Sequence, residues 1–236
     1  MINKRGYLRA GFIFAAVLLL CFLFQTPVLS AAVTKDEILK AVQKRYMAVT
    51  DLTADYIRIT SSPATESVFR AASEQKASGK LLFKKPNKLR LNQIKPRPET
   101  LVTNGFTVWW YIPADKQVQR FKGLDFFTDL KPFVDFLDGL GRLSDRFSIS
   151  LTPEEKIPKN IYELVLVPAD NNTGPQSITL WLDARDYSLI GFRFTSLLKE
   201  TTDFQLRNIR YNQGLKNDLF EFKIRPDTEV IDTKPP

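Results

Sequence analysis

The chain has 236 residues, with 34 Lys and Arg against 26 Asp and Glu, a formal net charge of +8 and no histidine. The absence of histidine excludes Ser-His-Asp and Cys-His catalysis, histidine metal sites and imidazole pH switches. The basic residues are interspersed, and no Lys/Arg block or Gly-rich aromatic motif points to nucleic acid. We therefore expect no nucleic-acid partner and favour acidic lipid surfaces or acidic protein partners.

The N-terminal segment has the profile of a signal peptide. Three basic residues precede an apolar run over residues 11–24, and small residues follow at 30–32. We expect cleavage near 30–32, so that residues 1–31 are the signal and residues 32–236 form a single exported domain. An uncleaved anchor over residues 10–29 is the alternative, because that stretch just reaches the ~20 residues that span a bilayer.

The only cysteine, Cys21, lies inside this apolar run, so the exported domain can form no disulfide. Its fold must then rest on core burial. Lipoprotein signals place a small residue before the cysteine, whereas Leu20 precedes Cys21 here. We therefore do not expect a lipidated N-terminus.

An amphipathic helix is expected after the signal, followed by strands. Thr34 and Glu37 have the spacing of a capping box, and apolar residues recur at helical intervals as far as Tyr46. From Ala54 the period changes to two, which predicts a strand. The polar stretch over residues 61–78 is expected to be a loop.

Short strands at close spacing follow this loop. Turn signals such as Pro86-Asn87 and Asn104-Gly105 separate them, as in an antiparallel meander. The expected strands are residues 80–85, 88–94, 99–103, 107–112 and 117–121.

A strongly apolar helix is expected to interrupt the strands between residues 124 and 143. Pro132 suits its first turn, and apolar residues follow at a period near 3.6. Further strands are expected at residues 146–151, 161–167, 177–182, 188–195, 203–211 and 219–224. About twelve strands and two helices predict a mainly β (α+β) fold, a strongly curved sheet or partly open barrel whose concave face the apolar helix covers. That architecture suits an apolar ligand.

Nothing in the sequence positively supports an enzyme. No Gly-rich phosphate loop occurs, so we expect no nucleotide and no other cofactor. Carboxylate pairs such as Glu154-Glu155, or Asp125 with Asp129, are the minimum that a glycosidase needs. These residues lie in predicted loops or helix flanks, where carboxylates are mostly solvated charge.

The chain contains two segments, residues 79–91 (GKLLFKKPNKLRL) and residues 101–113 (LVTNGFTVWWYIP), that resemble the LolA family of outer-membrane lipoprotein carrier proteins. That family has a strand, a basic pair with Pro, an apolar strand, then a valine-rich strand, Asp-Gly, and a Trp-containing strand ending in Tyr. The resemblance implies an incomplete antiparallel β-barrel of about 11–12 strands under a helical lid. It also implies a periplasmic carrier, expected to be monomeric, that receives acylated lipoproteins from an inner-membrane ABC transporter and passes them to an outer-membrane acceptor.

The predicted lipid-binding residues come from this resemblance and from strand parity. Alternate side chains share a face, so Leu81, Phe83 and Lys85 point the same way. Lys85 stands where the family has an arginine thought to hold the lid through hydrogen bonds to its backbone, and lysine lacks the planar fork of donors. A lysine that snorkels at a strand end is the alternative. The predicted set is Leu81, Phe83, Lys85, Leu89, Leu91, Phe133, Phe136, Leu137 and Leu140.

Two limits apply to this set. Sequence does not separate side chains that line a cavity from those that fill a core. Trp109 and Trp110 are adjacent, so at most one of them points inward, and packing is favoured over ligand contact for both.

Three other functions stay open. The same kind of sheet occurs in periplasmic sensors that restrain an anti-sigma factor, although those usually carry a further C-terminal domain. It also occurs in the lipidated outer-membrane acceptor, which needs a lipobox. A carrier of another amphiphile, such as a glycolipid, is the third.

Overall fold

The computed structural model describes residues 33–63, 74–123, 134, 138, 144, 147–169 and 175–233. Met1–Thr34 and Lys35–Pro236 are separate units, and the fold described below is that of the second. The predicted signal peptide lies outside the described residues. Within the described ranges, no helix is both long enough and apolar enough to cross a membrane.

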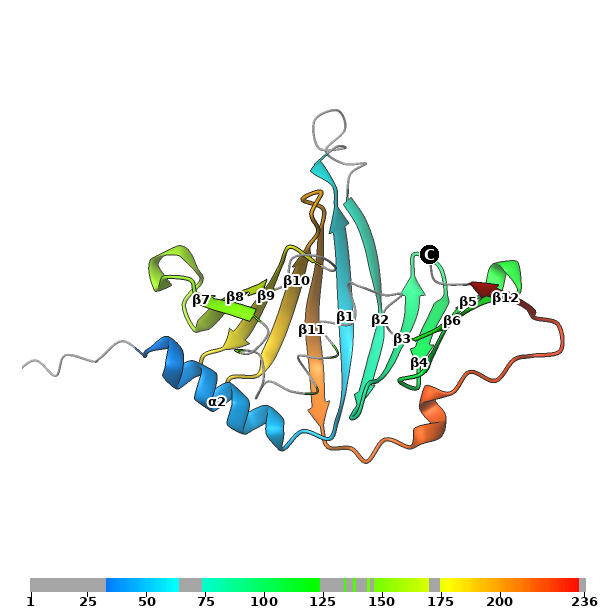
Figure 1. The fold of residues 1–236 in the computed structure, drawn as a ribbon, viewed down its shortest axis with the longest axis horizontal. Coiled ribbons are helices and arrows are strands. Elements are labelled where there is room, and N and C mark those ends of the chain that lie inside the picture. Colours follow the sequence, from blue (N-terminus) through cyan, green and yellow to red (C-terminus); the bar gives the residue numbers. More distant parts are fainter. Residues whose placement is uncertain are drawn as a thin grey trace, which may run out of the picture. The chain divides into compact units, whose positions relative to one another are not determined.

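Twelve strands form one sheet (Figure 1). In chain order they are β1 (Asp51–Ser61), β2 (Glu74–Lys84), β3 (Lys88–Lys95), β4 (Glu99–Thr103), β5 (Thr107–Ile112), β6 (Gln117–Lys122), β7 (Phe147–Leu151), β8 (Ile161–Pro168), β9 (Ser177–Asp183), β10 (Leu189–Thr195), β11 (Thr201–Tyr211) and β12 (Glu229–Thr233). Helix α2 (Lys35–Met47) precedes them, and short 3-10 helices connect them at η1 (Pro113–Asp115), η3 (Glu154–Lys156) and η4 (Asn217–Phe220).

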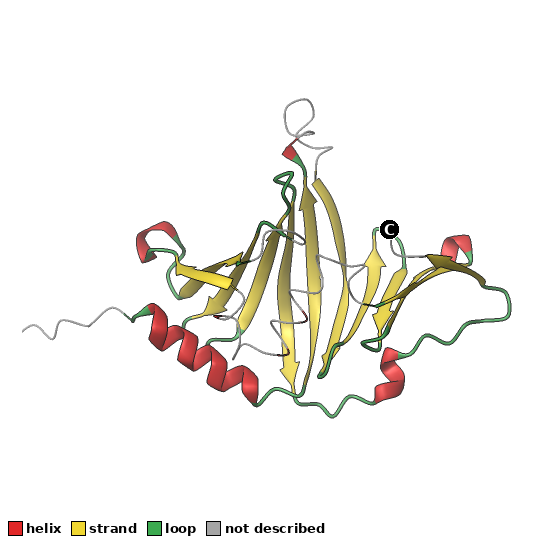
Figure 2. Ribbon diagram, in the orientation of Figure 1, coloured by secondary structure: helices red, strands yellow, loops and turns green. Residues whose placement is uncertain are grey.

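The sheet is curved and open. Across it the strands run in the order β12-β6-β5-β4-β3-β2-β1-β11-β10-β9-β8-β7, so β12 and β7 are its two edges. Figure 2 shows the strands splaying away from the long central pair β1 and β11. Neighbouring strands are antiparallel except β12 and β6, which pair in parallel. The predicted mainly β, incomplete barrel of about twelve strands is confirmed.

Two predicted segments differ most from the structure. β2 begins at Glu74, inside the stretch that we predicted to be a loop, because its polar first half still pairs through the backbone with β1. The strand predicted at residues 219–224 is wrong. Residues 219–220 belong to the end of η4, residues 221–224 follow it without pairing as a strand, and β12 lies further along the chain. Phe220 is buried and Phe222 packs beside it, so the alternation there reflects packing on the sheet and not strand pairing.

Helix α2 confirms the amphipathic helix that the sequence predicts. Its ends are tied to different parts of the sheet. Lys35 Nζ donates to the Ile149 carbonyl in β7 at 3.4 Å, and Arg45 Nη1 donates to the Asp186 carbonyl between β9 and β10 at 3.0 Å. The helix therefore runs across the ends of several strands (Figure 2). Its buried residues are Ile38, Val42 and Tyr46.

The sheet buries apolar side chains on both sides. We call the side that α2 covers the apolar face, and the other side the opposite face. A large cluster on the apolar face joins α2 to both halves of the sheet. A smaller cluster on the opposite face is completed by the chain after β11 and consists of Val102, Trp109, Tyr111, Val118 and Phe220.

The segment that crosses the opposite face is fixed at its start by Asp51. This side chain is only 2% exposed. Its Oδ1 accepts from Gln213 N–H at 2.7 Å, and its Oδ2 accepts from Gly214 N–H at 3.0 Å and Leu215 N–H at 3.2 Å. Gly214 has φ +69°, a backbone conformation that glycine adopts without the strain of a side chain. One carboxylate therefore organises the whole turn after β11.

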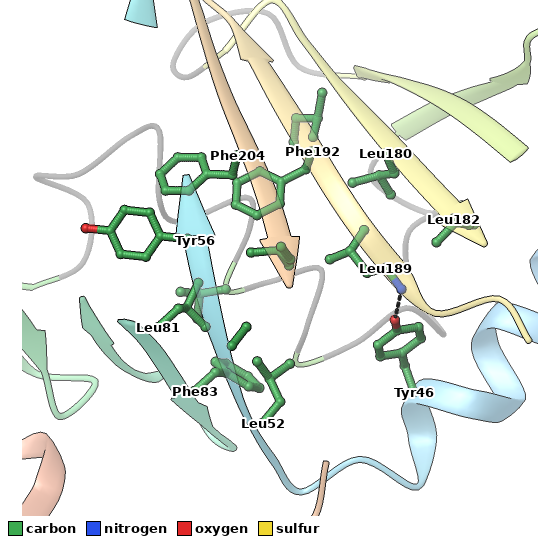
Figure 3. Packing of buried hydrophobic residues seen from close by; sticks show 14 of the residues in the cluster. Tyr46, Leu52, Tyr56, Leu81, Phe83, Leu180, Leu182, Leu189, Phe192 and Phe204 are labelled. Carbon is green, nitrogen blue, oxygen red and sulfur yellow. Dashed lines mark hydrogen bonds between the residues drawn. The ribbon is translucent and has the colours of Figure 1, made fainter. Parts of the chain in front are cut away.

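Tyr46 anchors α2 to β10, and a Tyr46→Phe variant tests this anchor. Leu189 N–H donates to the Tyr46 hydroxyl at 2.6 Å, so the variant leaves a buried donor unpaired (Figure 3). We expect a loss of about 1–3 kcal/mol in the free energy of unfolding, measured in urea at pH 7.

The same variant should also change how the free energy of unfolding depends on pH. Burial raises the pKa of Tyr46 above its ordinary value of 10.0. Above pH 10 the unfolded chain therefore loses this proton while the folded protein keeps it, and stability falls as pH rises. Tyr46→Phe should remove that contribution, so wild type should lose stability faster than the variant between about pH 10 and 11. Parallel losses in both proteins would contradict the assignment.

Candidate functional site

The predicted strand residues of the lipid-binding set lie together on the apolar face. Phe83 of β2 is paired with Leu52 of β1 and Leu89 of β3, and Leu81 is paired with Leu91 of β3. All five are buried (Figure 3 shows three of them). The parity predicted for β2 is therefore correct. Their role in binding lipid stays a prediction, because burial alone does not distinguish core from lining.

Aromatic rings continue this face on the other side of β1. Phe192 of β10 stacks on Phe204 of β11, with centroids 4.6 Å apart, and meets Phe194 edge-on at 5.3 Å. Tyr56 of β1 lies 5.7 Å from Phe204 (Figure 3). Leu180 and its neighbours on β8 and β9 extend the cluster toward β7. The apolar face therefore crosses the centre of the sheet without interruption.

The insertion between β6 and β7 touches this face where it is described. Val134 is helical, 1% exposed and part of the cluster on the apolar face. Asp138, also helical, accepts from Asn87 N–H at 2.9 Å in the turn between β2 and β3. The four predicted lid residues Phe133, Phe136, Leu137 and Leu140 lie outside the described residues.

Lys85 makes a contact that the sequence did not predict. Its Nζ donates to the Tyr46 carbonyl at the end of α2, at 2.7 Å. A cation is well placed there, since the last carbonyls of a helix carry partial negative charge. Burial lowers the pKa of Lys85, and the charge of Asp138 partly opposes that shift. Lys85 therefore lies within electrostatic reach of both α2 and the insertion.

A cavity of about 440 Å³ opens on the apolar face above Tyr56. Its volume lies within the range of small-molecule pockets, roughly 300–1,000 Å³. Of the predicted lipid-binding residues that are described, Leu91 lines it, whereas Leu81, Phe83 and Leu89 lie deeper in the core. Its apolar lining is Tyr56, Leu91, Leu101, Trp110, Phe194 and Phe204. Its polar lining is Arg58, Thr60, Gln75, Gln93, Arg97, Glu99 and Thr202.

The polar side of this cavity is a connected hydrogen-bond network. Glu99 Oε1 accepts from Arg97 Nε at 2.7 Å, and Glu99 Oε2 accepts from Trp110 Nε1 at 3.1 Å. Gln93 Nε2 donates to the Arg97 carbonyl at 3.0 Å, and Arg58 Nη2 donates to Gln93 Oε1 at 3.2 Å. Sequence reasoning missed these residues. The available signal was parity, since Arg58 shares a face with Tyr56 and Glu99 shares a face with Leu101.

The tryptophan pair follows its predicted geometry. Trp110 lines the cavity, whereas Trp109 belongs to the cluster on the opposite face. One of the two therefore points to the apolar face, as adjacent strand residues require.

Of the two carboxylate pairs considered for catalysis, the structure describes one. Glu154 and Glu155 are exposed on η3, and Asp125 and Asp129 lie outside the described residues. Within the described part of the chain, no three Asp, Glu or Cys side chains gather as metal ligands.

Together the fold and the site define a class of protein. An open antiparallel sheet carries a continuous apolar face, and a cavity with one apolar and one polar wall lies on it. Proteins built this way are suited to hold an apolar or amphipathic ligand.

The family follows from similarity to known proteins. The family model described as "Outer membrane lipoprotein carrier protein LolA" matches residues 65–223. This chain belongs to that family, which confirms the resemblance found in the sequence. A protein of Haemophilus influenzae strain Rd named outer-membrane lipoprotein carrier protein is 28% identical over 193 residues, covering 82% of this chain and 86% of that protein. One of the same name from Azotobacter vinelandii is 26% identical over 157 residues, covering 66% and 72%.

A solved structure agrees at the level of the fold. An uncharacterized conserved protein from Thermus thermophilus superimposes with a TM-score of 0.51 at 14% identity, covering 84% of this chain and 98% of that protein. This likeness supports the architecture alone.

Proposed function

We propose that this protein is a periplasmic carrier that binds the acyl chains of lipoproteins on its apolar face and moves them from the inner to the outer membrane. The observation that carries the proposal is the continuous apolar face ending in a cavity of about 440 Å³, in a chain of the lipoprotein carrier family. Relatives that bear the carrier name support the class of cargo. The basic signal-like N-terminus supports export.

Binding energy is ample for such a carrier. Burying one methylene contributes about 0.8 kcal/mol, so a sixteen-carbon chain contributes on the order of 12 kcal/mol if fully dewetted. A ligand bound this tightly dissociates slowly, so the carrier needs an interaction that competes with the acyl chain for the apolar face. Val134 already lies in the apolar cluster, and packing of the insertion against the sheet would supply that competition.

Lys85 is placed to influence this competition. Its Nζ donates to a carbonyl at the end of α2, and its pKa responds to the charge of Asp138 in the insertion. In this proposal Lys85 helps to set how firmly α2 and the insertion cover the sheet. The partners are those that the family implies, an inner-membrane ABC transporter that loads the carrier and an outer-membrane acceptor that empties it.

A Leu101→Glu variant tests the proposal in a release assay. Leu101 is half-buried and lines the cavity, so a carboxylate there should disfavour an acyl chain without emptying the core. Purified protein is added to spheroplasts that carry a radiolabelled lipoprotein, and the label in the supernatant is counted. Wild type should release the acylated lipoprotein, and Leu101→Glu should release about tenfold less.

Ile94→Glu is the matched control, because Ile94 is 57% exposed and does not line the cavity. It should behave like wild type. A second control is a lipoprotein whose acylated cysteine is changed to serine, which should not depend on the carrier for solubility. Failure of wild type to release acylated cargo, together with normal lipoprotein localisation in cells depleted of the protein, would contradict the proposed function.

A further inference from the structure

Polar side chains replace apolar ones at one end of the apolar face. On β1, Tyr56 is followed on the same face by Arg58 and Thr60. The neighbouring strands make the same change, from Phe204 to Thr202 on β11, from Leu91 to Gln93 on β3 and from Leu101 to Glu99 on β4. The cavity spans this boundary, so its two walls match the two ends of an amphiphile.

Small residues on β2 leave space for the Arg58 side chain to extend across that strand. It pairs with Ala77, and the next residue of β2 on that face is Gly79, which pairs with Gln93. At Gly79 an added Cβ would lie 2.0 Å from the Asn92 carbonyl oxygen, so no side chain fits. The guanidinium therefore reaches over β2 to Gln93 on β3, where Nη2 donates at 3.2 Å.

The charge of Arg58 is not matched by a carboxylate. Its partner Gln93 is neutral, and both oxygens of Glu99 are already engaged, one by Arg97 and one by Trp110. No ion pair to Arg58 occurs within the described part of the chain. Its Nε is buried and has no hydrogen-bond partner among the described residues. Buried donors are nearly always paired with protein, water or ligand, so this one is available to an acceptor that enters the cavity.

We infer that Arg58 binds the acidic head group, a carboxylate or a phosphate, of an acyl-bearing ligand whose chain lies against Leu91 and Phe204. This inference rests on the proposed function and adds a preference among acylated cargoes for those with a negative charge near the chain, which in a lipoprotein would come from an acidic side chain beside the acylated cysteine. Arginine presents several donors in a plane that matches carboxylate and phosphate oxygens. Thr60 and Thr202, whose hydroxyls are 3.5 Å apart, stand beside it on the polar wall.

Binding of three amphiphiles to the full-length, delipidated protein tests the inference by calorimetry. They are palmitate with a carboxylate, lysophosphatidylglycerol with a phosphate, and monopalmitoylglycerol with no charge. Wild type should bind at least one acidic ligand about tenfold more tightly than the uncharged one. The ligand that shows the larger preference identifies carboxylate or phosphate as the source of the charge.

Substitutions at Arg58 separate charge from packing. Arg58→Gln should bind the acidic ligand with about tenfold lower affinity than wild type and should bind monopalmitoylglycerol with unchanged affinity. Arg58→Lys should retain part of the preference, because it keeps the charge and loses the fork. Arg207→Gln, which removes an exposed arginine from β11, should bind like wild type.

Two failures are distinguishable. Equal affinity of wild type for charged and uncharged ligands, or a preference that survives in a folded Arg58→Gln protein, would overturn the head-group inference and leave the carrier function standing. If wild type binds none of the three amphiphiles, the head-group inference fails, and the release assay with acylated lipoprotein decides separately whether the proposed function stands.

Discussion

An Asp51→Ala variant is expected to lose about 3–5 kcal/mol of unfolding free energy. The buried carboxylate accepts three backbone N–H groups from residues 213–215. Alanine leaves these donors without the buried carboxylate that holds all three of them together. The turn directs the following segment onto the opposite face, so loosening it should also free Phe220 from its cluster. Urea unfolding followed by tryptophan fluorescence measures the loss, since Trp109 lies in that cluster.

Asp55→Ala is the matched control on the same strand. Asp55 accepts a single hydrogen bond, from Asn208 Nδ2, at an exposed position. Its removal should cost under about 1 kcal/mol. Asp51→Asn should fall between the two, because an amide keeps one acceptor oxygen and turns an NH₂ group toward the backbone donors. Similar losses for Asp51→Ala and Asp55→Ala would contradict the role given to Asp51.

A Phe192→Ala variant is expected to lose about 3–5 kcal/mol as well, and to regain part of it from ligand. Phe192 is fully buried and contacts Phe204 and Phe194, both of which line the cavity. Its truncation leaves an apolar void beside the proposed acyl site. A fatty acid should therefore raise the thermal midpoint of Phe192→Ala more than that of wild type, as measured by differential scanning calorimetry.

Phe220→Ala is the control that separates the stability lost by removing a core side chain from the extra ligand binding that a new void next to the acyl site would allow. Phe220 is also fully buried, but it lies in the cluster on the opposite face. We expect a similar loss of stability and no greater stabilisation by ligand than in wild type. Equal rescue of the two variants would place the acyl chain away from Phe192.

Local signals predicted the strands well where turn chemistry is strong. Asn104 caps its turn by accepting from Phe106 N–H and Thr107 N–H, and Gly105 has φ +97°. These requirements belong to a few adjacent residues, so the sequence displays them. The helix ending near Tyr46 was equally legible, because one helical face of α2 is buried.

The misplaced last strand shows where alternation misleads. Phe220 and Phe222 alternate with Glu221 as they would in a half-buried strand. Here Phe220 ends η4 and Phe222 lies just after it, and both pack against the sheet without strand pairing. The start of β2 was missed for the opposite reason, because a paired strand there lacks the apolar alternation of a strand. Its backbone pairs with β1, but its first side chains are mostly polar, and Gln75 among them lines the polar wall of the cavity.

The cavity itself could not be predicted from local patterns. Arg58 and Gln93 are 35 residues apart and meet only because the registers of β1, β2 and β3 align them over Gly79. Leu81 and Leu91 are both leucines at inward-facing strand positions, yet Leu81 fills the core and Leu91 lines the cavity. Pairing register over several strands decides this difference, and no single segment encodes it.

The open edges of the sheet have a mechanical consequence. In a closed barrel the number of strands and their stagger fix the radius, and widening it breaks backbone hydrogen bonds. Here β7 and β12 end the ladder without pairing to each other. The arc can therefore open or tighten by small changes of twist between neighbouring strands, with every ladder bond kept. Cargoes with different numbers of chains would then be accommodated by the same sheet at little cost in backbone pairing.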